Sequence, residues 1–150
     1  MDYSNTIIIS PFSKPMRNGK RNPKEYPWWI ELIALLKEKG FYVIQIGTPN
    51  EPQITEDFRT GLKFKELAEL MLKCRILISV DNFAHHFAAL HKKPCIVLWG
   101  KSDPLIFGYS QNHNLLKSRS FLRANQFGIW EEEEYNPDVF VTPEEVISYV

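Results

Sequence analysis

Residues 76–100 read ILISVDNFAHHFAALHKKPCIVLWG and decide the fold class of the chain. Two apolar runs, Ile76–Val80 and Cys95–Trp99, flank a turn at Asp81–His85 and a short helix at Phe87–Leu90. A short apolar run without alternation is typical of a strand that is buried on both faces. Two such strands joined by a helix predict a parallel βαβ unit.

The same pattern continues on both sides of this unit. The other expected elements are a strand at Thr6–Ser10, a helix from Pro27 to Gly40, a strand at Phe41–Gly47, a helix at Phe64–Cys74, and a last helix with Thr142 as N-cap, Pro143 at its first position and Glu145 at the capping-box position. Strands and helices therefore alternate. This order predicts a Rossmann-like α/β fold, a parallel sheet with helices on both faces, and residues 1–150 as a single domain.

The composition is that of an ordinary globular chain. It has 150 residues, of which 44% are hydrophobic and 24% charged, so one domain can bury a core. No apolar run is long enough to span a membrane, and residues 1–5 lack the features of a signal peptide. We therefore expect a cytoplasmic protein with a natural start at Met1 and two buried, reduced thiols, Cys74 and Cys95.

The charges are unevenly distributed, although the net charge is zero. One stretch is basic and contains no acid: Lys14, Arg17, Lys20, Arg21 and Lys24. From Glu131 onward the chain contains carboxylates and no Lys or Arg. Such asymmetry can mark an anion site, and a solvated loop with a solvated tail is the equally open alternative.

Residues suited to chemistry gather in the loops that follow the four expected strands. Ligands of open parallel sheets bind beyond the carboxyl ends of the strands. The basic first loop precedes a helix, so backbone N–H groups and the positive helix end could hold phosphate there. Glu51 follows the second strand and could accept hydrogen bonds from ribose, and His86, at the start of a helix, could contact a diphosphate.

Each of these candidates also has a structural interpretation. Asp81 could cap the helix that follows it. The His85–His86 pair could be incidental, and no further ligand has metal-like spacing, so we expect no metal. The chain has no Walker A, GxGxxG or GxSxG motif, so a P-loop, dinucleotide or serine hydrolase function is not favoured.

The segment Leu62–Tyr109 resembles the core of glycosyltransferase family 9, whose prototypes are heptosyltransferases of lipopolysaccharide synthesis. That family carries D-[ST]-G-x-x-H after a strand, then small residues, a proline, a strand and a G-x-[ST]-x-P turn. The matching positions are Asp81, His86, Ala88, Ala89, Pro94, Gly100, Ser102 and Pro104. Lys24–Pro27 matches the family's K-x-[WY]-P motif, and Gly47 with Glu51 matches its glycine–acid loop.

The resemblance implies a GT-B fold, of which this chain would be the carboxyl-terminal, nucleotide-sugar-binding half. It implies these substrate-binding residues: Lys24 and Ser13 at the donor phosphates, Glu51 at the ribose, Leu62 at the base, Asp81, Asn82 and His86 at the sugar and diphosphate, and Ser102 in the G-x-[ST]-x-P turn. It also implies a metal-independent reaction that inverts the anomeric centre. The catalytic base of such enzymes lies in the amino-terminal half, and we find no residue for it here.

Two features depart from the family pattern. Asn82 and Phe83 stand where Ser or Thr and then Gly are expected, and Phe83 should either crowd the ligand or stack on a neighbour. The chain is also about half the length of a GT-B enzyme, so a separate acceptor-binding chain or a homodimer would have to complete the cleft.

Three functions are compatible with the sequence. The first is a glycosyltransferase, or its donor-binding part, that uses a nucleoside-diphosphate sugar. The second is a non-catalytic nucleotide or nucleotide-sugar binding module. The third, binding of nucleic acid by the basic loop, is the weakest because no recognition motif accompanies that loop.

Overall fold

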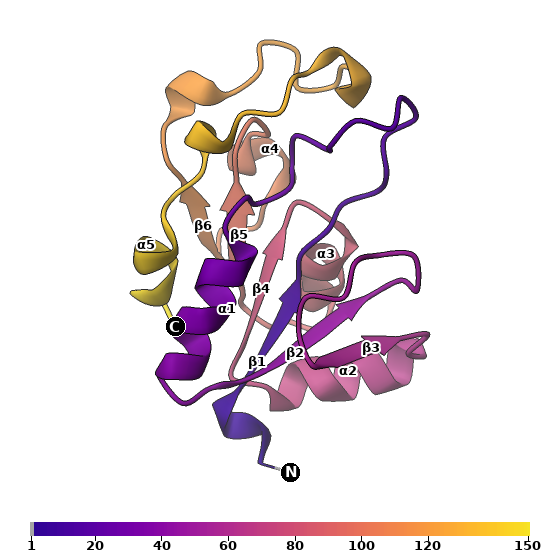
Figure 1. Cartoon of the computed structure of the whole chain (residues 1–150), viewed down its shortest axis with the longest axis vertical. Coiled ribbons are helices and arrows are strands. Elements are labelled where there is room, and N and C mark those ends of the chain that lie inside the picture. Colours follow the sequence, from indigo (N-terminus) through magenta and orange to yellow (C-terminus); the bar gives the residue numbers. More distant parts are fainter. Residues whose placement is uncertain (1) are drawn as a thin grey trace.

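The computed structural model describes residues 2–150 and contains a six-stranded sheet in the order β3-β2-β1-β4-β5-β6 (Figure 1). The strands are β1 (Thr6–Ser10), β2 (Tyr42–Gly47), β3 (Asp57–Thr60), β4 (Ile76–Val80), β5 (Ile96–Trp99) and β6 (His113–Leu116). All of the paired strands are parallel. The predicted Rossmann-like α/β fold is therefore confirmed. The strand order reverses between β1 and β4, and this switch point is where open α/β sheets bind ligands.

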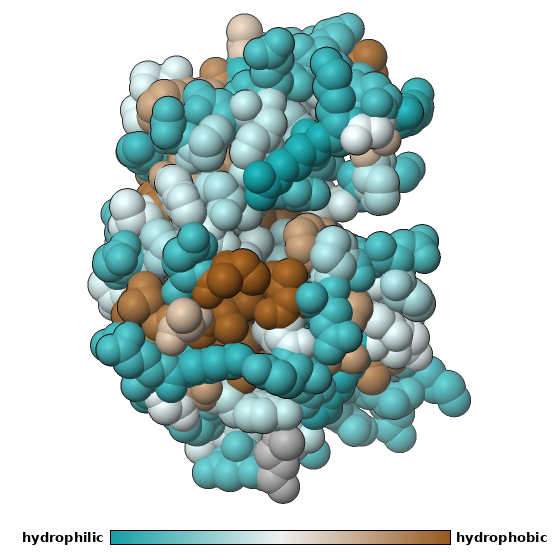
Figure 2. Space-filling model, viewed as in Figure 1, coloured by the Kyte–Doolittle hydropathy of each residue, from teal (hydrophilic) through white to brown (hydrophobic). Residues whose placement is uncertain are grey.

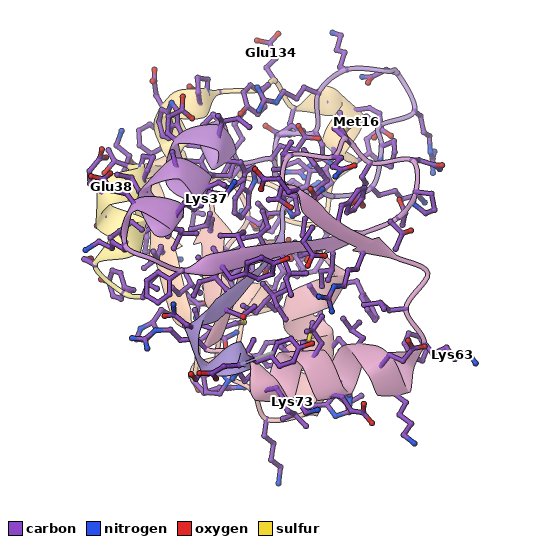
Figure 3. The ribbon with its side chains drawn as sticks, turned by 60° about the horizontal axis from the view of Figure 1, so that its bottom comes forward. Met16, Lys37, Glu38, Lys63, Lys73 and Glu134 are labelled. Atoms are coloured by element: carbon purple, nitrogen blue, oxygen red, sulfur yellow. The ribbon has the colours of Figure 1, made fainter. Side chains whose placement is uncertain are left out.

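Helices cover both faces of the sheet. They are α1 (Trp29–Glu38), α2 (Phe64–Lys73), α3 (Phe83–Leu90), α4 (Pro104–Phe107) and α5 (Pro143–Ile147). In Figure 3, Lys37 marks the end of α1 on one side of the sheet, and Lys63 and Lys73 mark α2 on the other. Short 3₁₀ turns occur at Tyr3–Asn5, Arg119–Phe121, Trp130–Glu132 and Pro137–Val139.

Alternate residues of β1 belong to two separate cores. Ile7 and Ile9 pack with Leu36 of α1, and Ile8 packs with Met71 of α2 and Ala88 of α3. All of these side chains are fully buried. Burial of one aliphatic side chain contributes about 1.5–3 kcal/mol, so a strand buried on both faces fixes the centre of the fold.

Two edge strands, β3 and β6, were not predicted. β3 has the sequence DFRT and β6 has HNLL, and each is only partly buried. An edge strand contacts one neighbour and tolerates polar residues, so neither segment has the apolar run that identifies β1, β4 and β5. The helix α4 also lies in the stretch after Gly100, for which no regular element was predicted.

Two helix starts differ from the prediction, and the last one is confirmed. The helix α1 begins two residues after Pro27, and α3 begins at Phe83, so His86 lies inside α3 and does not open it. Thr142 does cap α5, since its hydroxyl accepts the Glu145 N–H at 3.3 Å.

Cys74 and Cys95 are buried free thiols, as expected. Burial raises the pKa of Cys74 to about 11 and that of Cys95 to about 12, so neither thiol is reactive at neutral pH. Within residues 2–150, no helix combines the length and the apolar character needed to cross a membrane.

Candidate functional site

A cleft of about 840 Å³ lies at the carboxyl ends of β1, β2 and β4. Its walls come from the loops after these strands, the first residues of α2 and α3, and residues 129–131. Figure 2 shows the hollow between the upper and lower parts of the molecule. The volume and the position at the switch point are those of a site for a small ligand.

Most of the predicted site residues meet in this cleft. The residues that line it are Ser13, Lys24, Glu51, Leu62, Asp81 and Asn82. Two predicted residues do not line it, His86 and Ser102. The first residues of α3, Phe83 and Ala84, also line the cleft, whereas the start of α1 does not. The sequence predicted that the start of α1 would face an anion. The structure instead places the start of α3 at the cleft, so α3 provides the helix end that can face an anion.

The loops after β1 and β4 are tied together by side chains. The Ser13 hydroxyl donates to the Asp81 carbonyl at 3.0 Å, and the Asn82 amide donates to the carbonyls of Ser10 and Phe12, each at 3.1 Å. The Asn82 side-chain oxygen accepts the Ala84 N–H at 2.9 Å and so caps α3. The capping residue is therefore Asn82, which leaves the Asp81 carboxylate free for other contacts.

The Asp81 carboxylate contacts two donors, the ammonium of Lys24 and a ring nitrogen of His85. Lys24 Nζ lies 3.2 Å from Asp81 Oδ2, and His85 Nε2 lies 3.0 Å from Asp81 Oδ1. Burial raises the pKa of Asp81, but the hydrogen bond from His85 and the charge of Lys24 outweigh burial and lower it below its ordinary value. Asp81 is therefore a carboxylate at neutral pH, and Lys24 is held at the cleft by it.

Lys24 is also positioned through its own loop. The Asn22 side chain accepts the Lys24 N–H at 2.9 Å and donates to the Lys14 carbonyl at 2.9 Å. The Lys24 ammonium lies 5.2 Å from the centre of the Trp130 ring, which also lines the cleft. The basic loop is thus folded so that its last lysine faces the cavity.

Glu51 lies over Gly47, at the end of β2. A Cβ atom at Gly47 would collide with the Glu51 carboxylate, so the glycine makes room for this close approach. Burial raises the pKa of Glu51, and hydrogen bonds from Thr48 oppose that effect. The carboxylate is thus a partly desolvated acceptor in the cleft wall, suited to bind hydroxyl groups.

The other end of the cleft is apolar. It is formed by Ile46, Leu62, Phe64, Leu67 and Phe83. Phe83, at the position where glycine was expected, lies in the first turn of α3, and its ring stacks on that of Phe64 at 6.1 Å. Both rings are more than half exposed. Phe83 therefore adds an aromatic surface to the cleft.

The two predicted residues outside the cleft have other surroundings. His86 is exposed, and its Nδ1 lies 2.8 Å from the Tyr109 hydroxyl. Ser102 is buried in a small hollow that it shares with Lys24 and Asp81. Both therefore lie near the cleft without forming its wall.

One cluster in residues 2–150 could offer ligands to a metal ion. Donor atoms of Asp81, His85 and His86 lie within 4.8 Å of one another. Both oxygens of Asp81, however, are already engaged by Lys24 and His85. As arranged, the cluster is a hydrogen-bonded network beside a lysine ammonium group.

The acidic segment near the carboxyl terminus also reaches the cleft. Glu131 lies 3.9 Å from Arg17, and Glu133 lies 3.3 Å from Lys101 and 3.2 Å from Arg123. Ile129, Trp130 and Glu131 were not predicted as site residues, because only the fold brings their irregular segment over the basic loop. His85 was set aside as one of an incidental pair, and its i,i+4 spacing from Asp81 is the signal that could have identified it.

Comparison with known proteins identifies the family. Residues 5–134 match the model of glycosyltransferase family 9 (heptosyltransferase), and the chain therefore belongs to that family. Lipopolysaccharide heptosyltransferase 1 of Escherichia coli strain K12 is 28% identical over 113 residues, which cover 68% of this chain and 35% of that protein. The chain thus spans only about a third of the length of this curated relative.

Solved structures share the fold. The E. coli ADP-heptose heptosyltransferase II superposes on 99% of this chain with a TM-score of 0.69 and 16% identity, and the match covers 46% of that enzyme. An E. coli heptosyltransferase solved with ADP gives a TM-score of 0.60 and 22% identity, over 71% of this chain and 35% of that one. At these identities the likeness concerns the fold.

Proposed function

We propose that this chain binds a nucleoside-diphosphate sugar and forms the donor-binding, carboxyl-terminal half of a GT-B glycosyltransferase. A partner chain or a second copy would supply the acceptor site and the catalytic base. The observation that supports this most is Lys24, whose ammonium faces a cleft at the switch point beside the first turn of α3. A lysine and a helix start on one cleft wall suit a diphosphate.

The remaining cleft residues fit the other parts of such a donor. Glu51 is an acceptor for the ribose hydroxyls, and the apolar end around Leu62 suits the base. In this proposal Asp81, Asn82 and Ser13 lie in the cleft wall beside the sugar and the diphosphate, and His86 and Ser102 lie just outside that wall. The first donors to test are ADP-sugars, because one structural neighbour was solved with ADP.

The proposed chemistry needs no metal ion. In an inverting transfer, a base removes the proton of the acceptor hydroxyl as it attacks the anomeric carbon, and the nucleoside diphosphate leaves. Lys24 and the amides of the first turn of α3 would stabilise the negative charge that develops on the leaving group. This chain supplies the second of these functions, and the base would come from the other half of the cleft.

The alternative is a non-catalytic nucleotide-sugar binding module. The pairing of two of the cleft carboxylates favours it, since Asp81 is held by Lys24 and His85, and Glu131 faces Arg17. Neither is free to act as a general base. Transfer of sugar to any acceptor by the purified chain, alone or with a partner, would exclude this alternative.

Calorimetric titration with ADP-, UDP-, GDP- and CMP-sugars tests the proposal. We expect selective binding of one class, weakened by Lys24→Ala and by Asp81→Ala. Lys20→Ala is the matched control, because Lys20 is an exposed lysine of the same loop that does not line the cleft. Equal weakening by Lys20→Ala would show a non-specific charge effect, and binding of no nucleotide in the panel would contradict the proposal for the isolated chain.

A further inference from the structure

His85 is the one fully enclosed histidine among residues 2–150. It lies on α3, one turn after Asp81, and its Nε2 is 3.0 Å from Asp81 Oδ1. Its ring packs against those of His86, Trp99 and Tyr109 at 4.0, 5.5 and 5.9 Å. The ring is therefore held in one orientation by its neighbours.

The hydrogen bond defines which ring nitrogen carries the proton. The Asp81 carboxylate can only accept, so Nε2 must donate. Nδ1 is buried and has no hydrogen-bond partner among the described residues. An unpaired buried nitrogen destabilises a fold, so a histidine at this position calls for an explanation other than packing. The hydrogen bond from Nε2 to the Asp81 carboxylate is that explanation.

Asp81 presents a difficulty in a cleft that binds anions. It lines the cleft, and its negative charge would repel a diphosphate if it turned towards the ligand. Lys24 alone holds it weakly, because a lysine side chain is flexible and this one is 23% exposed. The rigid, enclosed ring of His85 fixes the other carboxylate oxygen.

We propose that His85 is a positioning residue for binding of the donor diphosphate. It holds the Asp81 carboxylate turned towards Lys24 and away from the ligand. This inference rests on the proposed function. His85 does not line the cleft, so its action on a ligand must pass through Asp81 and Lys24. The titratable groups that face the His85 ring are Asp81, His86 and Tyr109, and Lys24 lies behind Asp81, with which it pairs.

Two substitutions separate this role from packing. His85→Leu fills the space and removes the donor, whereas His85→Gln keeps an N–H donor at a similar reach. For the nucleoside diphosphate that binds best in the panel, we expect His85→Leu to weaken binding about ten-fold, the effect of losing a charge-assisted hydrogen bond. The corresponding nucleoside should bind equally to both proteins, and His85→Gln should restore most of the diphosphate affinity.

A double-mutant cycle shows whether the effect passes through Asp81. In an Asp81→Asn background the charge is absent, so His85→Leu should have little further effect on diphosphate affinity. An equal loss in both backgrounds, or an equal loss of nucleoside and diphosphate, would overturn the proposal. Thermal unfolding of each variant identifies those that are simply unfolded.

A ligand-free measurement keeps the inference separate from the proposed function. If wild-type protein binds no nucleotide, the proposed function fails, and ¹⁵N NMR of the histidine rings still tests the contact. We expect Nε2 of His85 to carry the proton that Asp81 accepts, and Asp81→Asn to change this signal. A proton on Nδ1 alone would overturn the inference whatever the ligand results.

Discussion

The ammonium of Lys24 lies 3.2 Å from Oδ2 of Asp81, so the cation of the cleft and the anion at the end of β4 form an ion pair. The two groups come from loops, and they are 57 residues apart in the chain. Asp81 is 10% exposed and Lys24 is 23% exposed. The pair is therefore partly shielded from water, and its loss should affect stability as well as binding.

Lys24→Met should lower the free energy of unfolding, because it leaves a largely buried carboxylate with His85 as its one remaining partner among residues 2–150. We expect a loss of about 1–3 kcal/mol, less than for a fully buried pair because Lys24 reaches solvent. The double variant Lys24→Met/Asp81→Asn should be more stable than the sum of the single effects predicts. Urea unfolding measures all three, and strict additivity would show that the two groups do not interact.

The lowered pKa of Asp81 makes stability depend on acid pH. The pKa of Asp81 in the folded protein lies below its ordinary value, so the carboxylate stabilises the fold above that ordinary value. This stabilisation is lost as the pH falls through the folded pKa. The melting temperature of the wild-type protein should therefore fall more steeply below about pH 4 than that of Asp81→Asn. Parallel melting curves over that range would contradict this.

Nucleotide binding should be unaffected by metal removal. The donor atoms of Asp81, His85 and His86 lie close together, but Asp81 has both oxygens engaged and Lys24 places a positive charge beside them. A divalent cation would have to displace these contacts. Calorimetric titration before and after treatment with EDTA should give the same affinity for a nucleoside diphosphate. A loss with EDTA that His86→Ala reproduces would instead identify a metal site.

The central fold could be predicted because four strands are short apolar runs that are buried on both faces. Burial of Ile7, Ile8 and Ile9 on two faces leaves a pattern in the sequence that a strand exposed on one side does not. The edge strands β3 and β6 lack it, since DFRT and HNLL are only partly buried. These strands form because they pair with β2 and β5, and the sequences of the two segments alone do not show that pairing.

The residues that line the cleft could be predicted where they follow strands. Those from other segments could not. Lys24, Glu51 and Asp81 lie in such loops, and the structure brings them to one cleft. Trp130 and Glu131 come from an irregular segment, and only tertiary contacts, such as that of Glu131 with Arg17, place them at the cleft. His85 could have been identified by its i,i+4 spacing from Asp81, which brings the two side chains together because α3 begins at Phe83.

Phe83 stacks on a neighbouring ring, which is one of the two outcomes expected from the sequence. Its ring lines the apolar end of the cleft, stacks on Phe64 and remains 57% exposed. An exposed aromatic face beside a cavity is suited to stack on a flat ring such as a nucleobase. Phe83→Ala should therefore weaken binding of a nucleoside diphosphate about ten-fold or more, since stacking of one base contributes about 1–3 kcal/mol.

Pyrophosphate, which has no base, should bind equally well to the wild-type protein and to Phe83→Ala if the ring acts by stacking. Leu90→Ala is the matched control, because Leu90 is an exposed apolar residue of the same helix that does not line the cleft. Calorimetry with both ligands separates the outcomes. Equal weakening of pyrophosphate and nucleotide would mean that Phe83 shapes the start of α3, where the diphosphate is expected, and does not contact the base.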